Sequence, residues 1–220
     1  MDTRNERGVT VFALPSVPAD IRVVAYSHDC RPIPTSYGAI ICAAAFIRIF
    51  RGLPLDAVEV ECGDMILSVS FSDNCKNLSL ILPKCKPYVA KSCIFPQGIE
   101  KDVNLVRYES LQTTVAVTDS RDVDAVERSH LKFLLSSFPD ADISVAYSCL
   151  GSVIRAVYHA LRPRPDIPLT VALAAYGSSR EREKKTVLTD GVSIAISPTW
   201  NGVRIQLPSP RFMSFSTPYL

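Results

Sequence analysis

The sequence predicts an α+β protein made of two pseudo-symmetric lobes, each a mostly antiparallel, β-barrel-like sheet around a central helix. The first observation is an internal repeat, because the phrase at residues 23–27 recurs at 144–148 and the phrase at 78–83 recurs at 203–208. The second is the segment 38–50, which is apolar on nearly every face and therefore predicts a helix buried all round. A buried helix with strands around it, occurring twice, fits neither a parallel sheet nor a sandwich.

In the first half, strands are expected at 9–14 and 21–27, and Pro32 and Pro34 exclude a helix from the loop that follows. The buried helix begins at Gly38 and stops before Gly52. Three strands come next, at 57–61, 65–71 and 78–82. Residues 84–104 have little pattern and contain two prolines, so they are expected to link an N-terminal lobe at 1–90 to a C-terminal lobe at 91–220.

In the second half, the analysis predicts a strand at 113–118, an amphipathic helix capped by Asp122 or Asp124 and running to 137, and a strand at 143–148. A second central helix is expected to start at Gly151 and to cover 152–161. The remaining expected elements are strands at 169–173, 192–197 and 203–207, a charged solvated loop at 178–186, and a C-terminal edge strand at 209–220.

Composition narrows the function. The net charge of +2 does not favour nucleic-acid binding, which needs a concentrated basic surface. None of the seven cysteines shows Cys-x-x-Cys spacing, so no metal site is expected, and reduced thiols in a cytoplasmic protein are the simplest interpretation. No signal peptide is recognised, and the longest apolar run, 39–50, is too short to cross a bilayer.

Several segments resemble the diaminopimelate epimerase superfamily, which includes the proline racemases and the phenazine-biosynthesis isomerases. They are the strand and loop at 22–31, the helix start and helix at 37–53, the strands at 58–71, the acidic helix start at 115–126, and Phe138-Pro139-Asp140. The resemblance implies two lobes whose central helices meet, amino end to amino end, in a cleft. There, one cysteine per lobe moves the α-proton of an amino acid without a cofactor, since helix amino ends lower thiol pKa values and hold carboxylates.

The chain departs from that pattern at its active-site positions. The first-lobe cysteine position falls on Ser36 or Tyr37, and the second aligns best with Cys149. The substrate-binding loop before the second cysteine is missing between Tyr147 and Gly151. The N-terminal strand of the family also has no counterpart, which would leave an open sheet edge, and a homodimer or a tight partner is expected to cover it.

The resemblance and the residue types together select the candidate site. Candidate catalytic residues are Cys149, Tyr37, Ser36 and His28. Candidate substrate-binding residues are Asp29, Gly38, Gly151 and Ser152.

Two functions remain open. The first is a cofactor-independent isomerase that transfers a proton at a small-molecule carbon acid by epimerisation, double-bond shift or cyclisation. The second is a non-catalytic binding or assembly protein that keeps the fold. The shortened 147–151 loop and the missing first cysteine favour this alternative. The sequence offers no sign of membrane or nucleic-acid binding.

Overall fold

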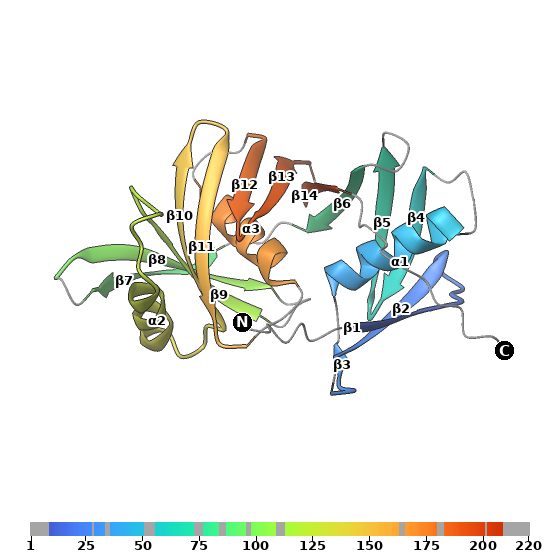
Figure 1. The fold of residues 1–220 in the computed structure, drawn as a ribbon, viewed down its shortest axis with the longest axis horizontal. Helices are drawn as coiled ribbons and strands as arrows, with labels where there is room; N and C mark the ends of the chain where they lie inside the picture. Colours follow the sequence, from blue (N-terminus) through green and yellow to red (C-terminus); the bar gives the residue numbers. More distant parts are fainter. Residues whose placement is uncertain are drawn as a thin grey trace, which may run out of the picture.

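The computed structural model describes residues 9–27, 29–33, 36–50, 56–72, 77–83, 87–95, 98–108, 113–162, 166–179, 183–200 and 202–208. The first half of the chain holds β1 (Val9–Leu14), β2 (Ile21–Ser27), β3 (Pro32–Ile33), α1 (Tyr37–Phe50), β4 (Ala57–Cys62), β5 (Met65–Ser72) and β6 (Asn77–Pro83). The second half holds β7 (Pro87–Ile94), β8 (Glu100–Tyr108), β9 (Thr113–Asp119), α2 (Arg128–Ser137), β10 (Ile143–Leu150), β11 (Val153–Ala160), α3 (Ile167–Ser178), β12 (Lys185–Thr189), β13 (Val192–Pro198) and β14 (Gly202–Pro208). The protein is thus α+β, as expected (Figure 1).

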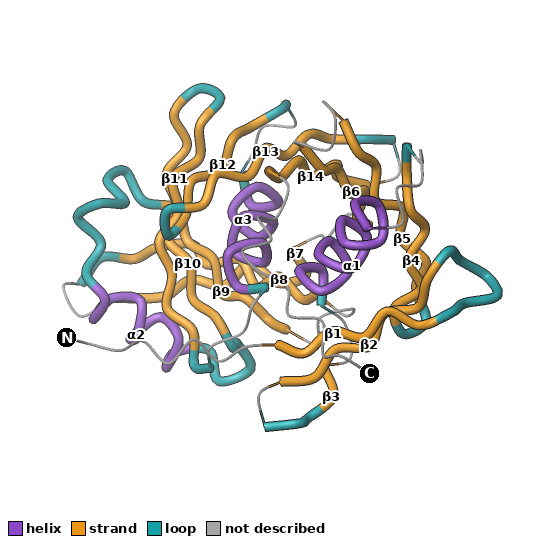
Figure 2. Tube along the Cα trace, turned by 45° about the vertical axis from the view of Figure 1, so that its right-hand side comes forward, coloured by secondary structure: helices purple, strands orange, loops and turns teal. Residues whose placement is uncertain are grey.

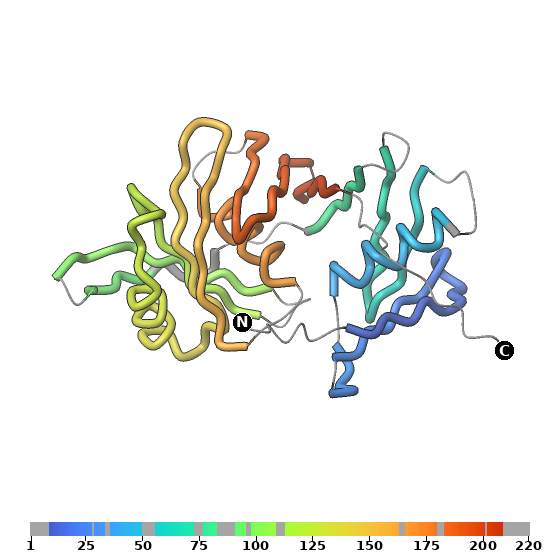
Figure 3. Tube along the Cα trace, in the orientation of Figure 1, coloured from blue at the N-terminus to red at the C-terminus, as the bar shows by residue number. Residues whose placement is uncertain are grey.

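The strands form one hydrogen-bonded path in the order β1-β2-β4-β5-β6-β14-β13-β12-β11-β10-β9-β8-β7, with β3 paired to β2. The two halves of the chain join where β6 and β14 pair antiparallel, with Ile205 opposite Leu80. Figure 3 shows this last described strand beside the strand that ends at residue 83.

The same order of connections occurs twice. An antiparallel pair (β1–β2, then β10–β11) leads into a helix and a parallel partner (β2–α1–β4, then β11–α3–β12). Two antiparallel strands complete each set, β5 and β6 in the first and β13 and β14 in the second. The pseudo-symmetry of the two lobes and the boundary near residue 90 stay predictions.

The helices α1 and α3 lie on the inner side of the strands (Figure 2). A single apolar cluster contains residues of both helices and of the strands around them, among them Ile40, Val60, Val171 and Ile194. Such burial explains why α3 is apolar on all faces, from Ile167 through Tyr176. Burial of the apolar surface of this cluster supplies most of the free energy that holds the two helices in place.

The first half confirms the predicted strands and the apolar helix, which begins one residue earlier, at Tyr37. The expectation that this helix is buried all round is wrong, because Cys42, Phe46 and Ile49, which share one face at helical spacing, are exposed. The loop expected at 28–36 contains the two-residue strand β3. The linker expected at 84–104 is wrong for its described residues, because β7 and β8 form an antiparallel hairpin that continues onto β9. Alternate residues of β8, such as Val103 and Leu105, are buried, and that alternation is the strand signal.

The second central helix was placed on the wrong segment. Residues 153–160 form β11, and the helix is α3 at Ile167–Ser178, where a strand at 169–173 was expected. The segment 153–158 is rich in β-branched and aromatic residues, which favour strands. The apolar run of α3 has no period that separates a buried helix from a buried strand, and its three alanines favour the helix.

The repeated phrases explain the error. The phrase at 78–83 and its copy at 203–208 do occupy equivalent strands, β6 and β14. The phrase at 23–27 lies in β2, which leads into α1, but its copy at 144–148 lies in β10, one strand before the equivalent position. The helix was therefore expected one strand too early.

Three smaller differences complete the comparison. The helix α2 begins at Arg128, several residues after the expected caps Asp122 and Asp124. The segment expected as a solvated loop at 178–186 includes the start of β12 at Lys185, and the edge strand expected at 209–220 lies outside the described residues. No helix within the described ranges has the length and apolar character needed to cross a membrane.

Candidate functional site

The amino ends of α1 and α3 meet. Each helix connects two parallel strands, so each starts beyond the carboxyl end of the strand before it and runs back along the sheet. The meeting point is fixed by a hydrogen bond of 2.7 Å from the backbone amide of Gly38 to Oδ1 of Asp166. Figure 1 shows the two helix ends that this bond joins.

Ser36 caps α1. Its hydroxyl oxygen accepts a hydrogen bond of 3.1 Å from the amide of Ala39, and its carbonyl accepts one of 3.0 Å from the amide of Ile40. This is the arrangement that serine favours before a helix. Ser36 is buried, so these contacts satisfy backbone groups that water cannot reach.

Asp166 occupies the capping position of α3 but serves the other helix. Its side chain makes no hydrogen bond to the first turn of α3. The carboxylate instead accepts from the Gly38 amide and, at 3.3 Å, from the Ser36 hydroxyl. Glycine at position 38 permits this approach, since a Cβ there would lie 3.2 Å from Oδ1.

The electrostatics of this junction favour an anion. The amino end of a helix carries a partial positive charge, and two such ends face the buried Asp166 carboxylate. The carboxylate in turn affects two thiols. Burial, followed by the Asp166 charge, raises the pKa of Cys42. Burial also raises the pKa of Cys62, with a smaller contribution from Asp166, although a hydrogen bond from the Ser36 backbone opposes both.

These thiols are therefore protonated at neutral pH, and among these described residues of the junction, Asp166 carries the carboxylate. Within the part of the chain that the structure describes, no three His, Cys, Asp or Glu side chains form a group that could hold a metal ion.

The structure brings together three of the predicted site residues, namely Ser36, Tyr37 and Gly38. Tyr37 is the first residue of α1 and is buried. Asp29 lies in the exposed turn between β2 and β3, where it pairs with Arg31 at 3.1 Å and accepts a hydrogen bond from Ser27. His28 lies outside the described residues.

Three other predicted residues lie elsewhere. Gly151 and Ser152 form the two-residue turn between β10 and β11, and Gly151 has a φ of +57°, which suits a tight hairpin turn rather than a helix start. Cys149 is exposed beside that turn, with its sulfur 3.8 Å from the Gly151 carbonyl. The expectation that these three residues lie at a helix amino end is wrong.

The topology sets the separation. Because β11 and β12 are parallel, α3 runs back from the end of β11 to its start, so Gly151 lies toward the carboxyl end of α3. Lys185, the residue that opens β12, confirms this placement by donating a 2.6 Å hydrogen bond to the Gly151 carbonyl. The length of α3 alone puts Cys149 about 18 Å from the junction.

The sequence contained a signal for Asp166 that was missed. Asp166 followed by Ile167 and Pro168 is a capping residue with proline in the first turn, a typical helix start. Nothing local in the sequence places Cys62 near Ser36, because that proximity comes from the pairing of β4 with β2.

Neither a protein-family model nor a curated protein sequence matches this chain. Solved structures do match. One is a protein of Clostridium difficile strain 630 described as phenazine biosynthesis PhzC/PhzF, which is 12% identical with a TM-score of 0.66 over 96% of this chain and 83% of that chain.

Two further matches come from Agrobacterium species. A structure assigned as a proline racemase, from Agrobacterium radiobacter K84 with bound carbonate, is 14% identical with a TM-score of 0.58 and covers 91% of this chain and 73% of its own. A hydroxyproline epimerase from Agrobacterium vitis, with bound trans-4-hydroxy-L-proline, is 11% identical with a TM-score of 0.56 and covers 90% and 71%. The chain therefore shares its fold with these solved structures, which belong to the diaminopimelate epimerase superfamily that the sequence resembles.

Proposed function

We propose that the protein is a cofactor-independent isomerase that transfers a proton at a carbon acid, at the junction of α1 and α3. The observation that supports this most is the buried Asp166 carboxylate held at the amino end of α1 by Gly38 and Ser36. Solved structures with this fold include a hydroxyproline epimerase and a structure assigned as a proline racemase.

In the proposed step, Asp166 takes the proton from a carbon next to a carbonyl group. The C–H bond breaks, its electron pair passes to the carbonyl oxygen, and the new O–H bond forms on the carboxylate. Once protonated, the Asp166 carboxyl group is neutral and holds the Gly38 amide and the Ser36 hydroxyl less strongly. These two donors can then stabilise the negative charge on the enolate oxygen.

The proton must then return to the same carbon on its other face, or to a neighbouring carbon. Tyr37, at the start of α1, and Cys62, whose raised pKa keeps it protonated at neutral pH, are the proposed donors. Cys149 has no part in this proposal, and the role predicted for His28 stays a prediction.

The proposal is tested by deuterium exchange. The protein is incubated in D₂O with a library of carbon acids that includes proline and 4-hydroxyproline, and deuterium at carbon is read by NMR and mass spectrometry. We expect exchange with at least one member. Asp166→Asn keeps the size and an acceptor oxygen but removes the base, so it should lower the exchange rate by about 100-fold or more.

The control is Asp140→Asn, which changes an exposed carboxylate that is not part of the proposed site. This variant should keep the wild-type exchange rate. Equal rates in wild type and Asp166→Asn would overturn the role of Asp166. If Cys149→Ser abolished exchange, the exposed thiol would be the catalytic group, and the junction would be the wrong site.

A non-catalytic binding or assembly protein is the second candidate, and one observation favours it. The Asp166 carboxylate already occupies the Gly38 amide that a substrate anion would use. If no carbon acid exchanges and Asp166→Asn changes only stability, this candidate is the better one. The homodimer stays a prediction as well, and light scattering that finds a monomer would contradict it.

A further inference from the structure

A pocket lies on the face of the sheet opposite α3. Along β10, Ile143, Val145 and Tyr147 belong to the cluster around α3, whereas Ser144 points the other way and donates a 2.7 Å hydrogen bond to the carbonyl of Leu131 in α2. Ala146 shares the face of Ser144 and forms part of a cavity of about 290 Å³ between α2 and the sheet. This pocket is therefore separate from the Asp166 junction.

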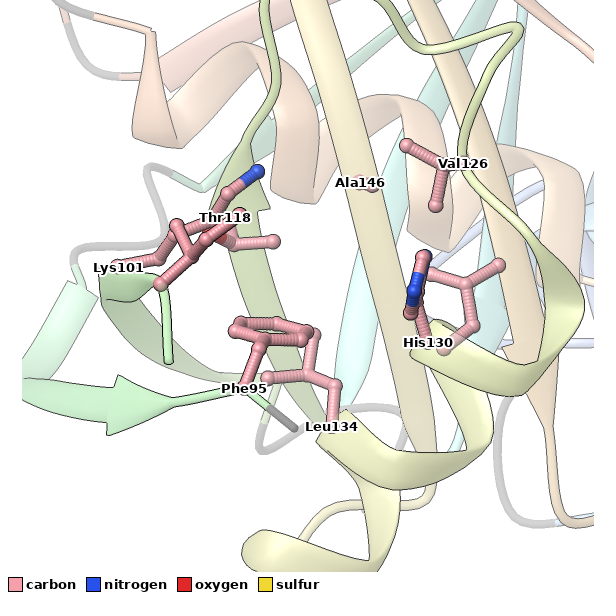
Figure 4. Close-up of a pocket in the computed structure, with 9 residues that line it drawn as sticks. Phe95, Lys101, Thr118, Val126, His130, Leu134 and Ala146 are labelled. Carbon is pink, nitrogen blue, oxygen red and sulfur yellow. The ribbon is translucent and has the colours of Figure 1, made fainter. Parts of the chain in front are cut away.

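The pocket has a mostly apolar lining with a few polar side chains. Its apolar lining comes from Phe95, Ile99, Val126, Leu131, Leu134 and Ala146. Its polar lining comes from Lys101, Thr118 and His130. Figure 4 shows Lys101 and Thr118 on one side of Ala146, His130 and Val126 on the other, and Phe95 and Leu134 below.

Lys101 is the charged group of this lining. It is half-buried, and its ammonium lies 5.9 Å from the centre of the Phe95 ring and 3.4 Å from the carbonyl of Asp119. An ammonium has three N–H donors, so these contacts leave it capacity for an anion. The neighbouring Asp102 is directed to the opposite face of β8 by strand alternation, which keeps its charge away from the pocket.

His130 gives the other side of the pocket an aromatic and polar edge. Its ring is half-buried and stands edge-on to Phe95, with the ring centres 6.3 Å apart. Lysine and imidazole therefore face a common apolar space from two elements that are about 30 residues apart in the chain.

We propose that this pocket binds a small monocarboxylate with an apolar body, its carboxylate at Lys101 and its body over Ala146 between Phe95 and Leu134. At about 30 Å³ for each water-sized group, the cavity holds about ten non-hydrogen atoms, the size of octanoate. A charge-assisted hydrogen bond from Lys101 selects the carboxylate, and the apolar lining selects the body.

Calorimetry with octanoate tests the proposal, with octan-1-ol as the neutral ligand of the same body and 3-phenylpropionate as the aromatic one. Lys101→Met keeps the aliphatic stem and removes the charge. It should weaken octanoate binding by about tenfold or more, the effect of one lost charge-assisted hydrogen bond, and leave octan-1-ol binding unchanged. The matched control is Lys91→Met, because the Lys91 ammonium also lies over a phenylalanine ring, 6.0 Å from the centre of Phe138, but does not line the pocket.

A second variant tests the location. Val126 is half-buried at the pocket edge, so Val126→Trp should fill the cavity without removing core packing and should abolish binding of all three ligands. Circular dichroism checks that each variant is folded.

Three results would each overturn the proposal: octanoate binding that Val126→Trp does not affect, an octanoate affinity of Lys101→Met equal to that of wild type, or no octanoate binding at about 1 mM. Tighter binding of 3-phenylpropionate than of octanoate would assign an aromatic body, and the reverse an aliphatic one. Deuterium exchange at the Asp166 junction is a separate readout, so either site can fail alone.

Discussion

The carboxylate of Asp166 accepts a 2.7 Å hydrogen bond from the amide of Gly38, 128 residues away in the chain, and this contact joins the amino ends of the apolar helices α1 and α3. Asp166 begins one helix and caps the other. The favourable charge of a helix amino end thus stabilises an internal anion in this structure. Its consequences for stability and for nearby thiols can be measured.

Asp166→Ala should lower the free energy of unfolding by about 1–3 kcal/mol, because it leaves the Gly38 amide without its carboxylate partner. Asp166→Asn retains an acceptor oxygen and should lose less. Urea unfolding followed by circular dichroism gives both values. Asp140→Ala, at an exposed site, is expected to stay within about 0.5 kcal/mol of wild type, and an Asp166→Ala result in that range would contradict the structural role.

Gly202→Ala should disrupt the pairing of β6 with β14 that joins the two halves of the chain. A Cβ at position 202 would lie 2.1 Å from the carbonyl oxygen of Leu82, so the strands must move apart, at a cost of about 2–3 kcal/mol. Gly151→Ala provides the comparison, since nothing lies within 4 Å of its Cβ and only its φ of +57° opposes alanine, at about 1 kcal/mol. Equal losses in the two variants would show that the β6–β14 contact is looser than described.

Alkylation of Cys42 should require a higher pH than alkylation of a free cysteine. Cys42 reaches the surface of α1, but the protein atoms packed around its thiol remove part of its hydration, and this loss, followed by the Asp166 charge, raises its pKa. The thiolate is the reacting species. Asp166→Asn removes the negative charge, so the pKa of Cys42 should fall and its alkylation at about pH 8 should accelerate. Mass spectrometry after iodoacetamide treatment reports each cysteine.

The buried Cys93 serves as the control for opening of the fold, because it belongs to a different cluster and should stay unreactive in both proteins. An alkylation profile of Cys42 that is the same with and without the Asp166 charge would rule out the coupling.

Tyr158 should make the protein lose stability at alkaline pH. Burial, then the charge of Asp190 and a 3.1 Å hydrogen bond to it, raises the pKa of Tyr158 from the ordinary 10.0 to about 12. The unfolded chain therefore releases this proton first. The contribution of Tyr158 to stability is complete below pH 10.0 and is lost as the pH rises through about 12.

Urea unfolding at several pH values between these limits, for wild type and Tyr158→Phe, measures the effect. The wild type should lose stability more steeply, since the variant lacks the proton. Parallel pH profiles would mean that the phenol is no less acidic when folded than when unfolded.

Local sequence patterns were sufficient for much of the fold. The helix α1 was predicted from its apolar composition, although not its exposed face, and β4, β5, β6, β13 and β14 were predicted from short apolar runs between turn residues. The resemblance to the epimerase superfamily supplied the architecture, and solved structures share that fold. For the site, Ser36, Tyr37 and Gly38 were placed correctly at a helix amino end, because the polar residue before an apolar run is a local signal.

The second half of the site could not be located from the repeat. A matching phrase of five residues fits either strand of a hairpin, and choosing β10 in place of β11 moved the expected helix from 167–178 to 152–161 and the expected thiol to Cys149. The apolar run of α3 has no period that separates a buried helix from a buried strand, so only its three alanines and the Asp166-Ile167-Pro168 start pointed to the helix.

The sequence by itself determined the element types that depend on neighbours in the chain: an apolar helix after Ser36, strands between turn residues, and the general architecture through resemblance. Only the tertiary structure decided which helix end meets α1, that Asp166 holds the Gly38 amide, and that Cys62 and Cys42 lie within reach of that charge. The reason is physical. Helix starts and turns arise from interactions among a few consecutive residues, whereas the junction depends on which strands pair across the sheet, and that pairing is decided by the burial of the whole apolar cluster.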